Sequence, residues 1–255
     1  MQQLRLFFIA LQFFTRLPIP RWVGFEPAWL HHASRYFPAV GIVVAAIAAA
    51  VYAVAALVLP PAVAVLLSTA AGIYATGAFH EDGFADSCDG LGGGHTRERV
   101  LDIMKDSRIG AYGAIGIGLM LATKIATLAS MPKLAVPGAL LVAHPLSRLM
   151  TCSLIWRMEY ARAEGKAKPL AQEMQSGEFA IAALTTALPA AAVLYLGWLN
   201  ITALAAGVGG MILATLWLAR KFQQRLGGYT GDCLGAVQQL AEAVFYLGAL
   251  AVTWN

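Results

Sequence analysis

Acidic residues are crowded into one short stretch of this 255-residue chain. Half of its fourteen Asp and Glu residues fall between positions 81 and 106. They are Glu81, Asp82, Asp86, Asp89, Glu98, Asp102 and Asp106. If residues 82–89 are helical, Asp82, Asp86 and Asp89 share one face, because their spacing is i, i+4 and i+7. Sets of oxygen ligands suit Mg²⁺ or Mn²⁺. We therefore expect a divalent metal site whose ligands are Glu81, Asp82, Asp86 and Asp89.

Cationic and flexible residues are interleaved with these acids. His80, Lys105 and Arg108 lie in the same stretch, and carboxylates beside cations are typical of a metal–phosphate site. Glycines follow the acids, and glycine lets the backbone approach an anion closely. The glycines expected to bind phosphate are Gly92, Gly93 and Gly94. The alternatives are a solvated acidic loop and a flexible glycine turn.

Three further polar positions extend the candidate site. Asp232 ends the polar segment GGYTGD and is interpreted either as another ligand or as the N-cap of the last helix. His144 and Arg148 are spaced i, i+4 within an apolar segment, where an arginine is costly unless it is paired or hydrated. Arg148 either contacts a substrate phosphate or forms a structural ion pair. Glu242 is the natural internal partner of Arg148 or Lys124, although Lys124 could instead snorkel to the membrane surface.

The elements that position these residues are long apolar segments. Apolar residues make up 59% of the chain and charged residues only 13%, against about 45–50% and about 25% in soluble domains. This composition excludes an ordinary soluble domain, a disordered chain and a disulfide-stapled miniprotein. Seven segments are long enough to span a bilayer. They are Pro38–Leu59, Pro61–Phe79, Ala111–Met131, Leu134–Trp156, Phe179–Trp198, Ile201–Ala219 and Gly235–Trp254.

The expected fold is all-α: a polytopic helical membrane bundle of about seven transmembrane helices, forming one domain over residues 1–255. The run Leu4–Phe14 is too short to span and is expected to be an interfacial helix. Residues 80–110 are expected to form an acidic loop that binds metal and phosphate.

The basic residues predict how the bundle is oriented. Fifteen of eighteen Lys and Arg residues cluster in the N-terminal region, in residues 97–108, in residues 157–168 and in residues 220–225. These clusters alternate with apolar runs, which is the pattern of positive charge retained in the cytoplasm and not that of a nucleic-acid-binding surface. The N-terminus and the acidic loop are therefore expected on the cytoplasmic side, with Trp156, Trp198 and Trp254 as interfacial anchors and Asn255 outside.

Five segments together resemble the adenosylcobinamide-GDP ribazoletransferase family, also called the cobalamin-5′-phosphate synthases. The segments are FFTRLPIP (13–20), ATGAFHEDGFADSCDGLGGG (75–94), RERVLDIMKDSRIGAYGA (97–114), HPLSR (144–148) and GGYTGDCLGA (227–236). They occur in the family's order and span nearly the whole chain. The departures are apolar exchanges, such as Phe79 and Phe84 where leucine is expected.

The resemblance implies a Mg²⁺-dependent (Mn²⁺ is possible) enzyme of the bacterial cytoplasmic, or inner, membrane. It would join adenosylcobinamide-GDP to α-ribazole or α-ribazole 5′-phosphate and release GMP, late in cobalamin biosynthesis. Asp82 would be catalytic as well as a ligand, and Lys105, Arg108 and Arg148 would hold phosphate oxygens. His80 or a metal-free carboxylate would accept the hydroxyl proton. The remaining substrate contacts are expected from His144, Asp106, Asp232 and the glycines.

Two other functions fit parts of the sequence. Asp86–Gly90 reads DSCDG, as in CDP-alcohol phosphotransferases, but Gly93 and Gly94 replace the Ala-Arg of that family and Asp102 and Asp106 come too early. A cation transporter would need acids deep within several helices, whereas Glu242 is the only acid inside a predicted span. A homo-oligomer remains possible, since nothing in the sequence predicts the oligomeric state.

Overall fold

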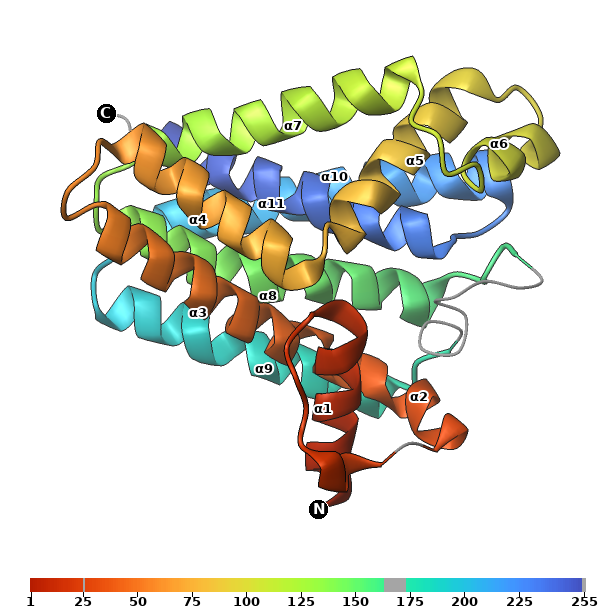
Figure 1. Cartoon of the computed structure of the whole chain (residues 1–255), viewed down its shortest axis with the longest axis horizontal. Coiled ribbons are helices and arrows are strands. Elements are labelled where there is room, and N and C mark those ends of the chain that lie inside the picture. The colour runs from red at the N-terminus through yellow and green to blue at the C-terminus, as the bar shows by residue number, and fades with distance from the viewer. Residues whose placement is uncertain (25, 163–172, 254–255) are drawn as a thin grey trace.

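The computed structural model describes residues 1–24, 26–162 and 173–253 (Figure 1). Within these ranges the secondary structure is helical, and the only β-type pairing is an isolated bridge between Tyr160 and Tyr229. Lys166, Lys168, Trp254 and Asn255, which contributed to the predicted orientation and anchoring, lie outside the described residues.

Six of the described helices are long and apolar enough to cross a membrane, or seven if the bent pair α4–α5 counts as one span. The six are α3 (Phe37–Ala55, continuous with shorter helical segments from Trp29), α7 (Ala111–Ala129), α8 (Ala135–Arg157), α9 (Ser176–Tyr195), α10 (Ile201–Leu226) and α11 (Gly231–Thr253). The predicted polytopic helical bundle is confirmed. The N-terminal helix α1 (Gln2–Phe14) has 13 residues and is too short to span.

The second predicted span, Pro61–Phe79, is not one straight helix. Helix α4 (Pro61–Thr76) ends where Gly77 and Ala78 adopt φ angles of +65° and +59°, a left-handed conformation that terminates a helix. Helix α5 (Phe79–Gly93) then leaves at 91° to α4. The acids therefore do not follow the second span straight out of the bilayer as expected, but lie on a separate helix that turns across the bundle.

Helices α8 and α11 form the centre of the bundle (Figure 1). They are the most buried of the long helices, with 72% and 67% of their apolar windows buried. Helix α3 packs along α8, and α11 packs against α5, α7, α8 and α10. Any polar side chain on the inner faces of α8 and α11 is therefore removed from both lipid and bulk water.

Two glycines bring α5 unusually close to α11. A Cβ atom at Gly83 would lie 2.9 Å from the carbonyl oxygen of Asp232, and one at Gly235 would lie 2.9 Å from that of His80. Only glycine tolerates such an approach of two backbones. This contact sets the first two turns of α5, which carry His80, Glu81 and Asp82, directly against the start of α11.

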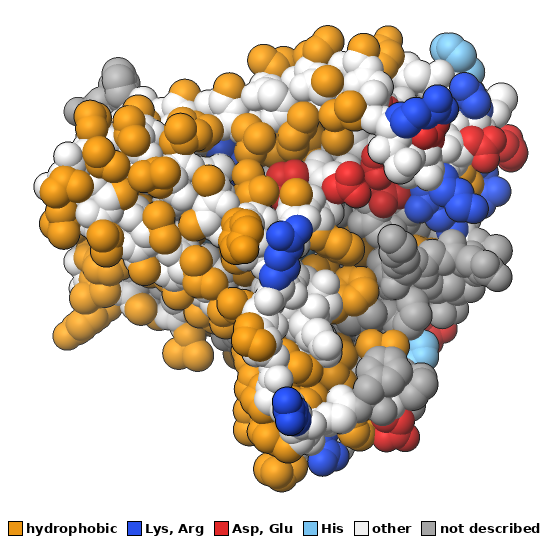
Figure 2. Space-filling view, in the orientation of Figure 1, with side chains coloured by type: hydrophobic (Ala, Val, Ile, Leu, Met, Phe, Trp, Pro, Cys, Tyr) orange, Lys and Arg blue, Asp and Glu red, His pale blue; other side chains and the backbone are white. Residues whose placement is uncertain are grey.

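The two ends of the bundle differ in composition. The short turns between α3 and α4, α7 and α8, and α9 and α10 lie at one end, with the C-terminus, while α6 (Arg97–Ile103) and the segment joining α10 to α11 lie at the other (Figure 1). On the face shown in Figure 2, charged side chains gather at this second end and the flanks are apolar. α1, η1 (Arg21–Val23), α2 (Pro27–Ala33) and η2 (Ser34–Tyr36) form an arm beside the bundle.

Candidate active site

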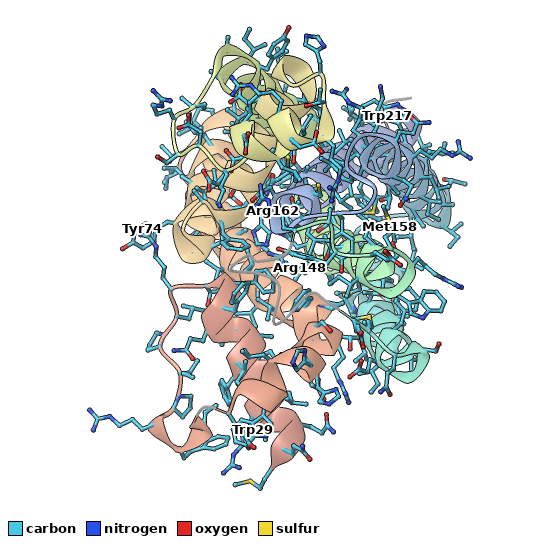
Figure 3. The ribbon with its side chains drawn as sticks, turned by 90° about the vertical axis from the view of Figure 1, so that its right-hand side faces the viewer. Trp29, Tyr74, Arg148, Met158, Arg162 and Trp217 are labelled. Atoms are coloured by element: carbon cyan, nitrogen blue, oxygen red, sulfur yellow. The ribbon has the colours of Figure 1, made fainter. Side chains whose placement is uncertain are left out.

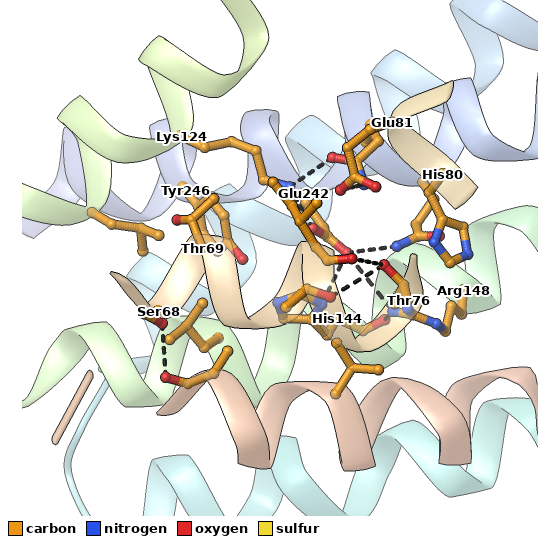
Figure 4. Close-up of a pocket in the computed structure, with 18 residues that line it drawn as sticks. Ser68, Thr69, Thr76, His80, Glu81, Lys124, His144, Arg148, Glu242 and Tyr246 are labelled. Carbon is orange, nitrogen blue, oxygen red and sulfur yellow. Dashed lines mark hydrogen bonds and ion pairs between the residues drawn. The ribbon is translucent and has the colours of Figure 1, made fainter. Parts of the chain in front are cut away.

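A network of buried charges lies between α7, α8 and α11 (Figure 4). The Nζ atom of Lys124 donates to Glu242 Oε2 at 2.6 Å and to Gln239 Oε1 at 2.8 Å. Lys124 is only 7% exposed, so it does not snorkel to the surface, and Glu242 is fully buried. Such a pair is stable only when further hydrogen bonds compensate the loss of hydration.

The second oxygen of Glu242 receives that compensation from α8 and α11. The Ser147 hydroxyl donates to Oε1 at 2.9 Å and the Gln238 amide at 3.1 Å. The Nδ1 atom of His144 lies 3.2 Å from the same oxygen, and Nη1 of Arg148 lies 3.8 Å from it. Glu242 is therefore the partner of Lys124 and Arg148 together.

Arg148 is the least satisfied member of the network. Its Nη1 atom donates to the carbonyl oxygen of His144 at 3.0 Å. Its Nε and Nη2 atoms are buried and have no hydrogen-bond partner among the described residues, although the residue is only 2% exposed. An unpaired buried donor costs about 1–3 kcal/mol, and more when it is charged. Phosphate and carboxylate are the anions whose geometry suits a guanidinium with two free donors.

These side chains line a small, partly open cavity that also receives His80 and Glu81 from α5 (Figure 4). One oxygen of Glu81 accepts a hydrogen bond from Gln239 at 2.9 Å, while Oε2 is buried and unpaired among the described residues. The space for water centres is about 30 Å³, enough for about two waters. The cavity is therefore charged, and it would have to widen to admit a group as large as phosphate.

A second group of carboxylates lies at the junction of α5 and α11. Asp82 and Asp86 of α5 and Asp232 of α11 are close enough to interact electrostatically. Arg162 supplies the counter-charge, with Nη1 2.9 Å from Asp232 Oδ2. Arg162 is held there because residues 159–161 pair with Tyr229: Ala161 N donates to Tyr229 O at 2.8 Å, and Tyr229 N donates to Glu159 O at 3.0 Å. Figure 3 shows Arg148 and Arg162 near the middle of the bundle viewed end-on.

Asp232 is not the N-cap of the last helix. It lies in the first turn of α11, and the amide of Cys233 donates instead to the Thr230 hydroxyl, at 3.4 Å. The carboxylate of Asp232 is thereby free to face Asp86 and Arg162.

The four acids expected as metal ligands are not gathered around one point. Within the described residues, no three His, Cys, Asp or Glu side chains are arranged to hold a metal ion. Glu81 points into the cavity. The oxygens of Asp89 accept hydrogen bonds from the backbone amides of Gly110 and Gly113, at 2.7 and 2.8 Å, at the N-terminus of α7. A carboxylate at this position satisfies free helix amides and complements the helix dipole, so Asp89 orders the start of α7.

The acidic loop expected at residues 80–110 is largely helical. Gly92 and Gly93 lie within α5 and Gly94 is its C-cap. A Cβ atom at Gly92 would lie 2.6 Å from the ring of Tyr112, and one at Gly94 would lie 2.6 Å from Val100. In this structure these two glycines let α6 and α7 pack against the end of α5.

The remaining candidates lie in an exposed turn. Asp106 and Arg108 bind each other, with Oδ2 and Nη2 2.7 Å apart, and the Arg108 side chain is 87% exposed. Hydrogen bonds from Arg108 lower the pKa of Asp106 from 3.8 to about 2. Both residues line an open hollow of about 600 Å³ that also includes Gly93, Asp89 and Arg99. Lys105 precedes Asp106 in the same turn and is also exposed.

The structure thus sorts the predicted site residues into three groups. It brings together His80, Glu81, His144 and Arg148 in the cavity, and Asp82, Asp86 and Asp232 at the helix junction. Lys105, Asp106 and Arg108 lie apart from both, in the turn before α7, where Asp89 and Gly93 line the open hollow; Gly92 and Gly94 serve helix packing. Sequence reasoning placed Gln238 on the same helix face as Glu242, treated Lys124 and Glu242 only as pairing partners, and overlooked Gln239 and Arg162. A polar residue on an apolar helix could have indicated Gln239, but no sequence signal indicates that Arg162 meets Asp232.

Comparison with known proteins identifies relatives along nearly the whole chain. Residues 6–250 match the family described as Cobalamin-5-phosphate synthase. Three relatives named adenosylcobinamide-GDP ribazoletransferase come from Leptothrix cholodnii, Shewanella frigidimarina and Ralstonia pickettii. They are 48%, 45% and 44% identical, over 98%, 99% and 95% of this chain and 96%, 96% and 93% of theirs. No solved structure matches the chain.

The matched region includes the residues of the cavity, those of the α5–α11 junction and all the long helices. Relatives with these sequence identities share a fold. The chain therefore belongs to the cobalamin-5-phosphate synthase family and is an enzyme.

Proposed function

We propose that the chain transfers the adenosylcobinamide phosphate of adenosylcobinamide-GDP to α-ribazole or α-ribazole 5′-phosphate and releases GMP. The names of the relatives support these substrates. The observation that carries the proposal is Arg148: a buried guanidinium that keeps two unpaired donors beside a polar cavity is suited to bind a phosphate oxygen. A diphosphate-linked substrate supplies one.

In the proposed reaction, a ribazole hydroxyl oxygen attacks the cobinamide-linked phosphorus. A new P–O bond forms, and the P–O bond to GMP breaks. The transition state spreads negative charge over the phosphate oxygens, so fixed cations supply much of the stabilisation. Arg148 would hold these oxygens, with Glu242 and His144 orienting its guanidinium. The exposed Lys105 and Arg108 would reach the phosphate of GMP only when the turn that carries them moves toward the cavity, because the structure places them apart from Arg148.

The hydroxyl proton needs an acceptor near the cavity. His80 is our candidate, because it lies in the first turn of α5 and lines the cavity beside Arg148. Glu81 Oε2, which is unpaired among the described residues, is the alternative acceptor. Either group would pass the proton on to water when GMP has left.

Divalent metal binding is also a proposal, and the carboxylates fit Mg²⁺ by chemistry, since all the donors are oxygens. Asp82 and Asp86 would hold the ion, with Asp232 or Glu81 as a further ligand. Asp232 would first have to leave Arg162. Bound Mg²⁺ would neutralise charge on the diphosphate oxygens. Mn²⁺ fits the same donors.

We further propose that the charged end of the bundle faces the cytoplasm across the inner membrane. Most of the basic residues that the structure describes gather at this end or on the N-terminal arm, as positive charge retained inside predicts. The exceptions are Lys124 and Arg148, which are buried in the bundle, and Lys133 in the turn between α7 and α8. Adenosylcobinamide-GDP carries a charged diphosphate that does not cross a bilayer unaided, so the site would open to the side that supplies it.

The test is GMP release by the detergent-purified protein from adenosylcobinamide-GDP and α-ribazole, with and without Mg²⁺. We expect Mg²⁺-dependent release. Arg148→Met should lower kcat/KM at least about 100-fold, because it removes a charge that meets the transition state. Arg157→Met, on a basic residue at the same helix's exposed end, is the matched control and should retain activity.

Other outcomes would contradict the proposal in different ways. Full activity of Arg148→Met would exclude Arg148 as the phosphate-binding residue, and full activity of Asp82→Asn with normal Mg²⁺ dependence would exclude the acid cluster. Release of CMP from a CDP-alcohol, without GMP release, would favour the phosphotransferase alternative. Metal flux in proteoliposomes without any nucleotide would favour a transporter.

A further inference from the structure

A second, aromatic cavity lies on the other side of Arg148. Its walls are phenylalanine rings from three elements: Phe13 and Phe14 of α1, Phe37 of α3 and Phe79 of α5. The rings contact one another edge-to-face, with the centroids of Phe14 and Phe37 4.5 Å apart and those of Phe14 and Phe79 5.6 Å apart. These phenylalanines lie on three separate elements between positions 13 and 79, and the fold brings them together around one small cavity.

This cavity is polar at one end only. Arg148, His80 and Gln238 border it, as they border the charged cavity described above. Arg148 Nε and Nη2 and Gln238 Oε1 are buried and unpaired among the described residues. The ring of His80 stacks on Phe14, with centroids 5.3 Å apart and ring planes inclined by 16°. The cavity therefore places phenylalanine ring faces and edges next to a guanidinium that has two unpaired donors.

We propose that this aromatic cavity binds the azole base of the ribazole substrate, with the sugar end directed toward Arg148. The assignment rests on the proposed function, which supplies the substrate. Its physical basis is that planar bases stack on aromatic side chains. Ribazole joins a planar apolar base to a polar sugar whose hydroxyl attacks phosphorus. The cavity has the same polarity, because its phenylalanine wall leads to the polar side chain of Arg148.

The other aromatic group among the substrates, guanine, fits this cavity poorly. Guanine carries hydrogen-bond donors and acceptors around its edge, and each costs about 1–3 kcal/mol if buried without a partner. The four phenylalanine side chains offer none, and the unpaired groups of Arg148 and Gln238 lie at the polar end, which the proposal gives to the sugar. An azole base fused to a hydrocarbon ring has almost no such groups, so the lining discriminates between the two bases.

Binding requires the cavity to widen. It has space for water centres of only about 20 Å³, room for one or two waters. The ring of Phe14 is the obstacle that can move, because Phe14 is the last residue of α1, a helix that packs on α2 and α3 beside the bundle. We infer that the base takes the place of Phe14 against His80 or inserts between the two rings.

The experiment measures equilibrium binding of α-ribazole, benzimidazole and GMP to the detergent-purified chain. Phe14→Leu and Phe13→Leu each remove a ring that lines the cavity and keep apolar volume. Each should weaken binding of α-ribazole and benzimidazole about tenfold, the equivalent of one lost stacking contact, without changing GMP binding. Phe8→Leu is the matched control, because Phe8 lies on α1 but packs against Trp22 outside the cavity; it should change none of the three.

The results separate this inference from the proposed function. Weaker GMP binding with unchanged α-ribazole binding would overturn the assignment, as would unchanged binding of all probes in both variants. If the wild type binds α-ribazole through these rings but releases no GMP from adenosylcobinamide-GDP, the proposed function fails and the base site stands. In active enzyme, the same variants should raise KM for α-ribazole and leave KM for adenosylcobinamide-GDP unchanged.

Discussion

Two polar regions of this protein contain similar residues but differ in burial. In the first region, Glu242, Lys124 and Arg148 are almost completely buried, and hydrogen bonds from three helices link them. Around Asp106, an equally well-formed pair with Arg108 lies in water. Exposed pairs contribute little to stability, because water and salt screen them, whereas breaking a buried pair leaves an uncompensated charge. Similar pairs therefore serve different purposes: the buried network positions Arg148, and the exposed pair leaves its groups free to meet a ligand.

The largest effect is expected from breaking the buried network. Glu242→Gln leaves Lys124 and Arg148 without their counter-charge and should lower the free energy of unfolding by about 3–5 kcal/mol. The measurement is an SDS-induced unfolding titration in mild detergent. Lys124→Met combined with Glu242→Gln should cost less than the sum of the single variants, because the charge pair is removed together. A change below about 1 kcal/mol in Glu242→Gln would mean that the buried network behaves like an exposed one.

An intermediate effect is expected at Asp89, which is buried but binds backbone amides. Asp89→Asn removes the charge at the N-terminus of α7 and should lower the free energy of unfolding by about 1 kcal/mol. It should leave Mn²⁺ binding, followed by electron paramagnetic resonance, unchanged. Asp86→Asn is the matched variant and should weaken Mn²⁺ binding. If Asp89→Asn weakened Mn²⁺ binding as much as Asp86→Asn, Asp89 would be a ligand as the sequence suggested.

The smallest effect on stability is expected from Arg108→Ala. Without its partner, the pKa of Asp106 should rise from about 2 toward 3.8, as followed by NMR titration of the carboxyl carbon. A lowered folded-state pKa stabilises the protein above pH 3.8 and loses that contribution as the pH falls through 2. The unfolding midpoint at neutral pH should not change measurably, since the pair is exposed. A large loss of stability would mean that the exposed pair contributes to folding as the buried network does.

The fold was largely predictable because hydropathy constrains a membrane protein strongly. Every backbone polar group in lipid must be paired within its own segment, so long apolar runs become helices. The break at Gly77–Ala78 escaped this reasoning, because the apolar run continues through it and the turn depends on contacts with the segment after α1, such as Arg16 N to Ala75 O at 2.8 Å.

The candidate site was predictable in composition and less so in arrangement. The i, i+4 spacing placed His144 and Arg148 on one helix face, and the structure directs both toward Glu242. The same reasoning grouped Asp89 with Asp82 and Asp86. Spacing along one helix does not reveal which neighbour occupies each side chain, and the amides of α7 occupy Asp89.

The sequence alone determined the class of this protein: a helical membrane bundle of the family that its motifs resemble, with its acids concentrated beside the second span. Those properties follow from composition and local pattern. Tertiary structure alone decided which polar groups meet, including Arg162 with Asp232 and the phenylalanines of α1 with Arg148. Such contacts join residues far apart in the chain, and they depend on how helices cross and how closely glycines let them approach.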